Sequence, residues 1–143
     1  MSSPEVLNWP AHAERIVALR KSIFLDELHY DPAFIQDESD EQSYHAGVFH
    51  DEELIAAGRI KFNSPLAFIS HLCVKEEHRR KEIGFKLLFF LKKAAKEQDC
   101  FTIQLSANID SMRFYEQAGF QAIDSAYQLH NQWHRQMKIK LKP

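Results

Sequence analysis

The stretch from residue 78 to residue 88, HRRKEIGFKLL, joins a strand-like run, FISHLCV, to the start of an apolar helical pattern. Gly84, one of only four glycines in the chain, lies inside that pattern. Glycine in a helix costs about 1 kcal/mol relative to alanine, so its use here predicts a need for a residue without a side chain. A strand, a turn with three cations, a glycine and a helix together indicate a site for a phosphate group.

The composition limits the kind of protein that carries this site. The chain of 143 residues is 45% hydrophobic and 27% charged, which is usual for a soluble globular protein, and we expect residues 1–143 to form one domain. The formal net charge is −2, so the whole chain lacks the basic field that nucleic acids bind. Any anion site is therefore local, and nucleic acid is not an expected partner.

Cysteine use and hydropathy indicate the compartment. Cys73 and Cys100 both stand in apolar surroundings and make no disulfide framework, as expected for reduced core residues of a cytoplasmic protein. No apolar run approaches the ~20 residues that span a bilayer. The first residues, MSSPEVLNW, lack the basic flank and apolar stretch of a signal peptide. The sequence thus predicts a cytoplasmic protein with no membrane partner.

The order of secondary-structure patterns predicts a mixed sheet with helices. Apolar residues at helical spacing predict three helices, over residues 11–28, 80–97 and 109–118, the last ended by Gly119 in a left-handed conformation. The acidic stretch 31–42 is expected to be a loop. Strands are expected at residues 6–9, 44–49, 54–62, 67–74, 101–105, 127–129 and 133–141. The fold class is α+β (α/β mixed), antiparallel except where a strand–helix–strand crossover makes neighbours parallel.

The type of phosphate site follows by exclusion. A P-loop needs several glycines and a Lys-Ser or Lys-Thr pair, and a dinucleotide fingerprint needs three glycines; neither is present in EEHRRKEIGFKLL. A helix N-terminus surrounded by Arg79, Arg80 and Lys81 remains, and such an end binds phosphate through its backbone N–H groups. The alternative is a solvated turn that merely carries cations.

A second motif, SANIDSMRFYEQAGF at residues 106–120, follows another strand. Its residues at fixed offsets are Asn108, Ser111, Phe114, Tyr115, Gly119 and Phe120. Together with the preceding Arg-x-x-x-x-Gly turn, it resembles the GNAT superfamily of acyl-CoA-dependent N-acetyltransferases, whose Arg-x-x-Gly-x-Gly pattern falls on Arg79, Glu82 and Gly84. The resemblance covers nearly the whole chain. It implies αβα layers, with a mixed, mostly antiparallel central sheet and helices on both faces.

The resemblance also implies a binding site for acetyl-CoA as cosubstrate, without a metal. It places the pantetheine arm beside the backbone of Leu72, Cys73 and Val74. It places the pyrophosphate at residues 79–85, namely Arg79, Arg80, Lys81, Glu82, Ile83, Gly84 and Phe85, where a Cβ on Gly84 would obstruct it. Glu82 departs from the usual glycine, but in a first helical turn its carboxylate favours the dipole and can face solvent. We therefore expect CoA binding to be retained.

The family chemistry is the direct attack of an amine on a thioester, and it needs a proton for the departing thiolate. Tyr115 corresponds to the family's common general acid, and a phenol of pKa near 10 is a reasonable donor to a thiolate of pKa roughly 8.5. The alternative role of Tyr115 is packing in the core. Asn108 would hydrogen-bond to the pantetheine or cap a helix. Cys73 reads as a strand residue, because no base is arranged to activate it as a nucleophile.

The general base cannot be identified from the sequence. Its candidates, acting directly or through water, are Glu27, Asp40, Glu41, His45 and His71. His130 and His134 are four residues apart, but in a turn and strand they share no helical face, which argues against a metal site.

These observations predict an acyltransferase that moves the acetyl group of acetyl-CoA to a primary amine through a ternary complex. The acceptor is a small-molecule or peptide amine, and the acidic residues near Asp37 to Glu41 hint that it is cationic. A homodimer is left open. The alternative function is a non-catalytic module that senses acyl-CoA.

Overall fold

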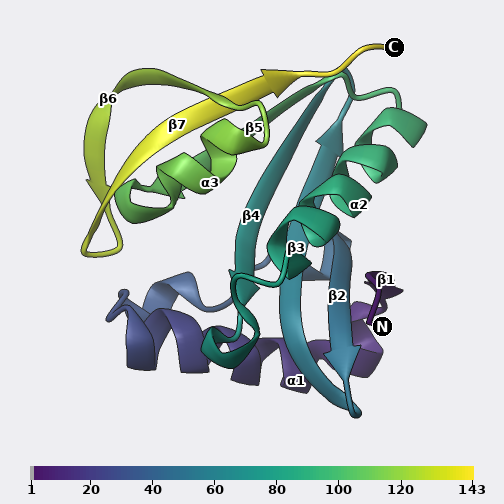
Figure 1. Cartoon of the computed structure of the whole chain (residues 1–143), viewed down its shortest axis with the longest axis vertical. Coiled ribbons are helices and arrows are strands. Elements are labelled where there is room, and N and C mark those ends of the chain that lie inside the picture. The colour runs from purple at the N-terminus through teal and green to yellow at the C-terminus, as the bar shows by residue number, and fades with distance from the viewer. Residues whose placement is uncertain (1) are drawn as a thin grey trace.

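The computed structural model describes residues 2–143, whose strands form one seven-stranded mixed sheet (Figure 1). The strands follow the order β1-β2-β3-β4-β5-β7-β6 across the sheet. β4 and β5 are parallel, and all other neighbouring strands are antiparallel. The strands are β1 (Glu5–Leu7), β2 (Tyr44–His50), β3 (Glu53–Asn63), β4 (Leu66–Val74), β5 (Thr102–Asn108), β6 (Gln121–Leu129) and β7 (Gln132–Lys140). The predicted fold class is confirmed, with the one parallel pair at the predicted crossover.

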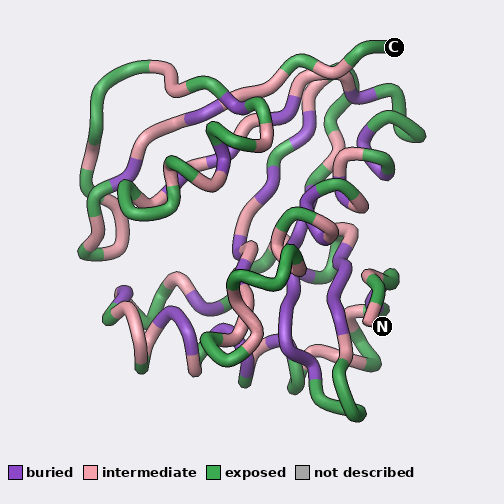
Figure 2. The backbone as a smooth tube through the Cα atoms, in the orientation of Figure 1, coloured by how far each residue is buried: buried purple, intermediate pink, exposed green. Residues whose placement is uncertain are grey.

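Helices cover both faces of this sheet. They are α1 (Trp9–Arg20), α2 (Ile83–Glu97) and α3 (Met112–Gln117), and α1 continues into a π-helical segment, Lys21–Glu27. α1 packs with one apolar cluster that includes Ile16, Leu19 and Cys73. α2 and α3 pack with a second cluster on the other face, which includes Leu87 and Tyr115. Figure 2 shows buried residues along the central strands and on the sides of the helices that contact them.

Several predicted boundaries need correction. The first strand ends at Leu7, because Asn8 caps a helix that begins at Trp9 with Pro10 in its first turn. α2 begins at Ile83 instead of residue 80. β6 begins at residue 121, six residues earlier than predicted, and a 3₁₀ turn over residues 109–111 precedes α3. Gly119 has φ of +98°, which confirms its predicted left-handed conformation after α3.

β4 and β5 separate part-way along their length. Their paired residues run from Leu66 and Thr102 to Ile69 and Leu105, although β4 continues for five more residues and β5 for three. In Figure 1 the β6–β7 hairpin accordingly diverges from the lower part of β4. On its other edge β4 is bulged against β3, with His71 in the left-handed region at φ of +56°. The last five residues of β4 therefore have no paired strand on the side of β5.

The stretch 31–42 was expected to be a loop, and it holds two single 3₁₀ turns, Pro32–Phe34 and Asp40–Gln42. Asp40, which is only 1% exposed, anchors it through ion pairs with Arg20 at 3.0 Å and Arg59 at 2.9 Å. Asp37 binds the same Arg59 at 2.7 Å. Arg20 and Arg59 thus neutralise the charges of the two aspartates in this segment.

Two hydrogen bonds connect the early segment to the β6–β7 hairpin. The backbone N–H of Asp31 donates to the carbonyl of His130 at 3.2 Å. The side-chain amide of Gln132 donates to the carbonyl of Leu28 at 2.6 Å. The hairpin therefore closes over the end of the π-helical segment from about one hundred residues further along the chain.

Candidate active site

Two neighbouring pockets meet at the separated end of β4. The first, which we call the turn pocket, has a volume of about 370 Å³. It is lined by the end of β4, the following turn, and the start of α2 and α3: Leu72, Cys73, Val74, Arg79, Arg80, Glu82, Gly84, Phe85, Ser111, Phe114 and Tyr115. Most of these residues belong to the two sequence motifs, so the fold brings the motifs together.

The second pocket, which we call the aromatic pocket, has a volume of about 290 Å³. Its own walls come from the π-helical segment, the following loop, β4, β5 and β7, and include Phe24, Glu27, Tyr30, Phe34, Ser70, His71, Ser106, Asn108 and His134. Six residues line both pockets, namely Leu72, Cys73, Val74, Arg79, Ser111 and Tyr115. The two pockets are therefore adjacent compartments that share one wall.

The N-terminus of α2 opens onto the turn pocket. Glu82 is the residue before the helix and has φ of +64°. The first hydrogen bond of the helix runs from the N–H of Lys86 to the carbonyl of Glu82 at 3.0 Å. The N–H groups of residues 83–85 come before that bond and have no intrahelical acceptor. Arg80 also lines the pocket, with φ of +63°. These groups fit the phosphates of a CoA molecule, because backbone donors and a cation lie beside one opening.

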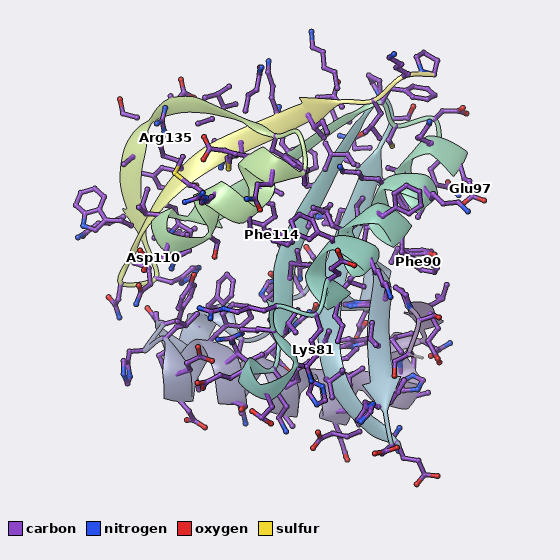
Figure 3. The ribbon with its side chains drawn as sticks, viewed as in Figure 1. Lys81, Phe90, Glu97, Asp110, Phe114 and Arg135 are labelled. Atoms are coloured by element: carbon purple, nitrogen blue, oxygen red, sulfur yellow. The ribbon has the colours of Figure 1, made fainter. Side chains whose placement is uncertain are left out.

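Two of the residues predicted for the pyrophosphate site, Lys81 and Ile83, do not line the turn pocket with their side chains. Both line a separate surface pocket together with His50 and His78, so any contact of Ile83 with a phosphate would come from its backbone N–H. Figure 3 shows Lys81 on the turn before α2. Arg80 and Lys81 are adjacent in the sequence but line different pockets.

Gly84 has a packing role that the motif did not reveal. An ideal Cβ at this position would lie 3.1 Å from Cε1 and 3.2 Å from Cζ of Phe114. Phe114 lies between α3 and α2 (Figure 3), and its ring also packs on Phe85 with centroids 4.6 Å apart. Glycine at this position therefore lets α3 approach α2, in addition to any effect on a ligand.

Arg79 is held by protein groups. Its guanidinium donates to both oxygens of Glu27, at 2.5 and 2.7 Å, and its Nε donates to the carbonyl of Val74 at 2.8 Å. The hydrogen bonds from Arg79 lower the pKa of Glu27 despite the opposing effect of burial. This bidentate pair stands between the two pockets and occupies the carboxylate of Glu27, one of the predicted base candidates.

Cys73 and His71 are unsuited to proton transfer or nucleophilic attack. Burial raises the pKa of the Cys73 thiol to about 12, so the thiolate is scarce at neutral pH. Burial, with the charges of Arg20 and Arg59, lowers the pKa of His71 to about 3. Both His71 ring nitrogens also have protein partners: Nε2 lies 2.7 Å from the carbonyl of Phe34, and Nδ1 lies 3.0 Å from Oγ of Ser70.

Tyr115 stands in the wall that the two pockets share, and its predicted role as general acid stays a prediction. Burial raises its pKa, with smaller contributions from Tyr30 and Cys73, so the phenol keeps its proton at neutral pH. The ring packs on Phe114 and Phe120, with centroids 5.0 and 5.7 Å away. The packing role and the donor role are therefore compatible in one side chain.

Asn108 makes the predicted capping contact. Its side-chain oxygen accepts from the N–H of Asp110 at 2.9 Å, and its amide donates to the hydroxyl of Tyr30 at 3.0 Å. A contact with pantetheine stays a prediction.

The other base candidates lie away from both pockets. Asp40 is committed to Arg20 and Arg59, and their bonds outweigh burial and hold its pKa at about 2. Nε2 of His45 lies 2.8 Å from the carbonyl of Asp40, and Glu41 is exposed. Two of the acidic residues that hinted at a cationic acceptor, Asp37 and Asp40, are thus paired with arginines, which weakens this support for a cationic acceptor.

Sequence reasoning missed the aromatic pocket and its polar residues Tyr30 and His134. Tyr30 borders the segment that was expected to be an irregular loop, and His134 was considered only as a metal ligand. The run of aromatic residues Phe24, Tyr30 and Phe34 was the available signal. No cluster of three or more metal-binding side chains occurs among residues 2–143.

The family model described as "Acetyltransferase (GNAT) family" matches residues 6–120. The chain belongs to this family. Its members are acyltransferases, and the predicted enzyme class and resemblance are confirmed. Among residues 2–143, no helix is long and apolar enough to cross a membrane.

Individual relatives agree with this assignment. Streptothricin acetyltransferase from Escherichia coli is 37% identical over 90 residues, which are 59% of this chain and 51% of that protein. The structure of E. coli ElaA superposes with a TM-score of 0.86 at 20% identity, covering 98% of this chain and 100% of that one. PaiA N-acetyltransferase from Thermoplasma acidophilum, solved in complex with coenzyme A, has a TM-score of 0.76 at 18% identity and covers 96% and 99%. The two structural likenesses show that the GNAT fold is shared.

Proposed function

We propose that this GNAT protein transfers the acetyl group of acetyl-CoA to a primary amine by direct attack in a ternary complex. The observation that carries the proposal is the pair of adjacent pockets with Tyr115 in their common wall. A reaction between two bound molecules needs two compartments that meet at one point, and holding both reactants there supplies much of the rate acceleration.

The turn pocket suits the nucleotide end of acetyl-CoA. The free N–H groups at the start of α2 and the guanidinium of Arg80 would hold its phosphates. The edge of β4 that β5 leaves at Ile69 would pair with the pantetheine amides, as an added strand pairs with a sheet edge. A backbone N–H of residues 72–74 would then polarise the thioester carbonyl.

The aromatic pocket suits the amine. Its neutral aromatic side chains exclude water from the reacting nitrogen, and its one carboxylate is already paired with Arg79. Tyr115, kept protonated by burial, would donate to the sulfur as the C–S bond breaks. The neutral wall favours an acceptor with an apolar or aromatic body next to its amine.

Two measurements test this function. Acetyl-CoA should raise the melting temperature, and thiol release should be seen with at least one member of an amine panel that includes streptothricin, aromatic amines and peptide amines. Binding of acetyl-CoA with no transfer to any amine would instead favour an acyl-CoA sensor. Absence of both effects would contradict both functions.

A matched pair of variants tests the phosphate placement. Arg80→Ala removes a cation from the turn pocket and should weaken acetyl-CoA binding about five- to tenfold. Lys96→Ala removes an exposed cation from the last turn of the same helix and should leave the affinity unchanged. Equal affinities of the two variants by calorimetry would contradict the placement of the phosphates at the turn.

A further inference from the structure

The proposed reaction must remove a proton from the attacking nitrogen, and the predicted base candidates are occupied or distant. Glu27 is paired with Arg79, and Asp40 is paired with Arg20 and Arg59. Burial and the charges of the same two arginines lower the pKa of His71 to about 3. The aromatic pocket also contains His134, which is 2% exposed. The inference below rests on the proposed function and concerns this histidine.

The hydrogen bonds of His134 define which nitrogen carries the proton. Nδ1 lies 3.1 Å from the carbonyl of Gln132, which can only accept, so Nδ1 is the donor. Nε2 of the neutral ring is then an acceptor, and it lies 3.3 Å from the hydroxyl of Tyr30. The hydroxyl of Tyr30 therefore donates to Nε2.

The same bonds orient the oxygen of Tyr30. Because Nδ2 of Asn108 donates to this oxygen at 3.0 Å, one of its two lone pairs is used. The second lone pair remains available to an N–H donor in the aromatic pocket, which Tyr30 lines. The hydrogen bonds thus run in one direction, from Asn108 through Tyr30 and His134 to the carbonyl of Gln132, and Nε2 of His134 is the base to which the hydroxyl proton of Tyr30 can pass.

The surrounding groups keep both Tyr30 and His134 neutral. Burial lowers the pKa of His134, opposed by the bond to Gln132, while the charge of His130 lowers it further. Burial raises the pKa of Tyr30, although the bond from Asn108 opposes this effect, and the carboxylate of Asp110 raises it further. The ring of Tyr127 stacks on His134 with centroids 6.1 Å apart. A neutral imidazole beside a neutral phenol is ready to accept a proton.

We infer that Tyr30 and His134 form a proton relay that deprotonates the acceptor amine. As the amine nitrogen bonds to the acetyl carbon and the C–S bond breaks, the proton of that nitrogen passes to the oxygen of Tyr30. The hydroxyl proton of Tyr30 passes at the same time to Nε2 of His134, which becomes an imidazolium. The sulfur takes a proton from Tyr115, and solvent later removes the proton of His134 and restores that of Tyr115.

The relay assigns separate tasks to its two members. Tyr30 would touch the amine, whereas His134 would act only through Tyr30. His71, which is also buried in this pocket, has similar partners, because its Nε2 must donate to the carbonyl of Phe34 and its Nδ1 lies 3.0 Å from Oγ of Ser70. The two histidines differ in their charged neighbours: burial and the charges of Arg20 and Arg59 lower the pKa of His71 to about 3, which makes it a weak base.

A double-mutant cycle tests the relay with one accepted amine and saturating acetyl-CoA. Tyr30→Phe and His134→Gln should each lower kcat by about 10²-fold or more, and the double variant should be no slower than either one, because the two groups act as a unit. The wild-type decline of kcat at acid pH that reports protonation of His134 should be absent from both single variants. Acetyl-CoA affinity should be unchanged.

Tyr127→Phe is the matched control, because it removes a hydroxyl from the ring that stacks on His134 without touching Tyr30. It should keep wild-type kcat. Wild-type turnover in Tyr30→Phe, or losses that add in the double variant, would overturn the relay while leaving the acetyltransferase function intact. Acetyl-CoA binding without transfer by the wild-type protein would overturn the proposed function itself, and the relay with it.

Discussion

The turn pocket and the aromatic pocket share a wall but are built in opposite ways. The turn pocket comes from two short segments, and the groups proposed to bind its ligand are the exposed Arg80 and the backbone N–H groups at the start of α2. The aromatic pocket comes from four stretches of the chain spread over residues 23–134, and its polar groups are neutral or already paired. Charge recognition can therefore be encoded in a local motif, whereas a low-dielectric reaction space requires the whole fold.

The largest expected effect lies at the wall between the pockets. Tyr115→Phe keeps the ring that packs on Phe114 and Phe120 but removes the phenolic donor, so kcat should fall by about 10²–10⁴-fold. Steady-state thiol release with an accepted amine measures this change. Melting temperature and acetyl-CoA affinity should hardly change.

An unchanged kcat across the pH range would remove Tyr115 from the mechanism. A weaker affinity for acetyl-CoA with normal kcat would assign Tyr115 to the turn pocket alone.

The buried carboxylate of Asp40, which lies outside both pockets, should affect the aromatic pocket more than the turn pocket. Asp40→Asn leaves Arg20, which is 1% exposed, without its anionic partner, so the free energy of unfolding should fall by about 3 kcal/mol. The segment that Asp40 anchors carries Phe34 into the aromatic pocket, whereas no residue of this segment lines the turn pocket. At temperatures where the variant is folded, KM for the amine should rise more than Kd for acetyl-CoA.

The pH dependence of stability provides the control for Asp40. Because its folded pKa of about 2 is below the ordinary value, the carboxylate stabilises the protein fully above pH 4, and this contribution is lost as pH falls toward 2. Denaturant titrations of wild type and Asp40→Asn should therefore converge at acid pH. Asp37→Asn, at a half-exposed carboxylate, should cost less than 1 kcal/mol. Equal losses in the two variants would contradict the burial argument.

The smallest effect should be confined to the turn pocket. Glu82 adopts φ of +64°, which costs a side-chain-bearing residue about 1–2 kcal/mol, so Glu82→Gly should stabilise the protein by up to about 1 kcal/mol. Acetyl-CoA affinity should stay the same or rise slightly, because a carboxylate leaves the anion site. Thermal melting and calorimetry measure the two quantities.

Lys81→Gly is the matched control for Glu82, because it places glycine one residue earlier, outside the left-handed region, and should destabilise the protein slightly. A large loss of acetyl-CoA affinity in Glu82→Gly would mean that the carboxylate makes a needed contact.

The sequence predicted the elements of the fold and the turn pocket because their signals are local. Helical spacing, alternating strands and the offsets around Gly84 and Tyr115 each lie within about twenty residues. Exact helix starts were missed, since the positive φ values of Arg80 and Glu82 are set by tertiary packing and both residues ordinarily favour helix. The same is true of the contact between Gly84 and Phe114.

The aromatic pocket could not be predicted because its contacts join distant positions. Tyr30 meets His134 across 104 residues, and the hydrogen-bond partner that determines the role of His134 is itself a backbone carbonyl. The sequence also suggested Asp40 as a base and the acids near Asp37 as a sign of a cationic acceptor, since nothing in it connects Asp37 and Asp40 with Arg20 and Arg59. The type of a residue predicts which chemistry its side chain can perform, whereas its hydrogen-bond and ion-pair partners determine which of its groups are left for a ligand.

The bonds from the β6–β7 hairpin to Leu28 and Asp31 have a consequence for biosynthesis. Domains begin to fold while the ribosome is still adding residues at about 5–20 per second. Every residue that lines the turn pocket has been added by position 115, but the aromatic pocket still lacks its last wall until position 134 emerges. A nascent chain that stops short of the hairpin would hold the complete phosphate site beside a reaction space open to water.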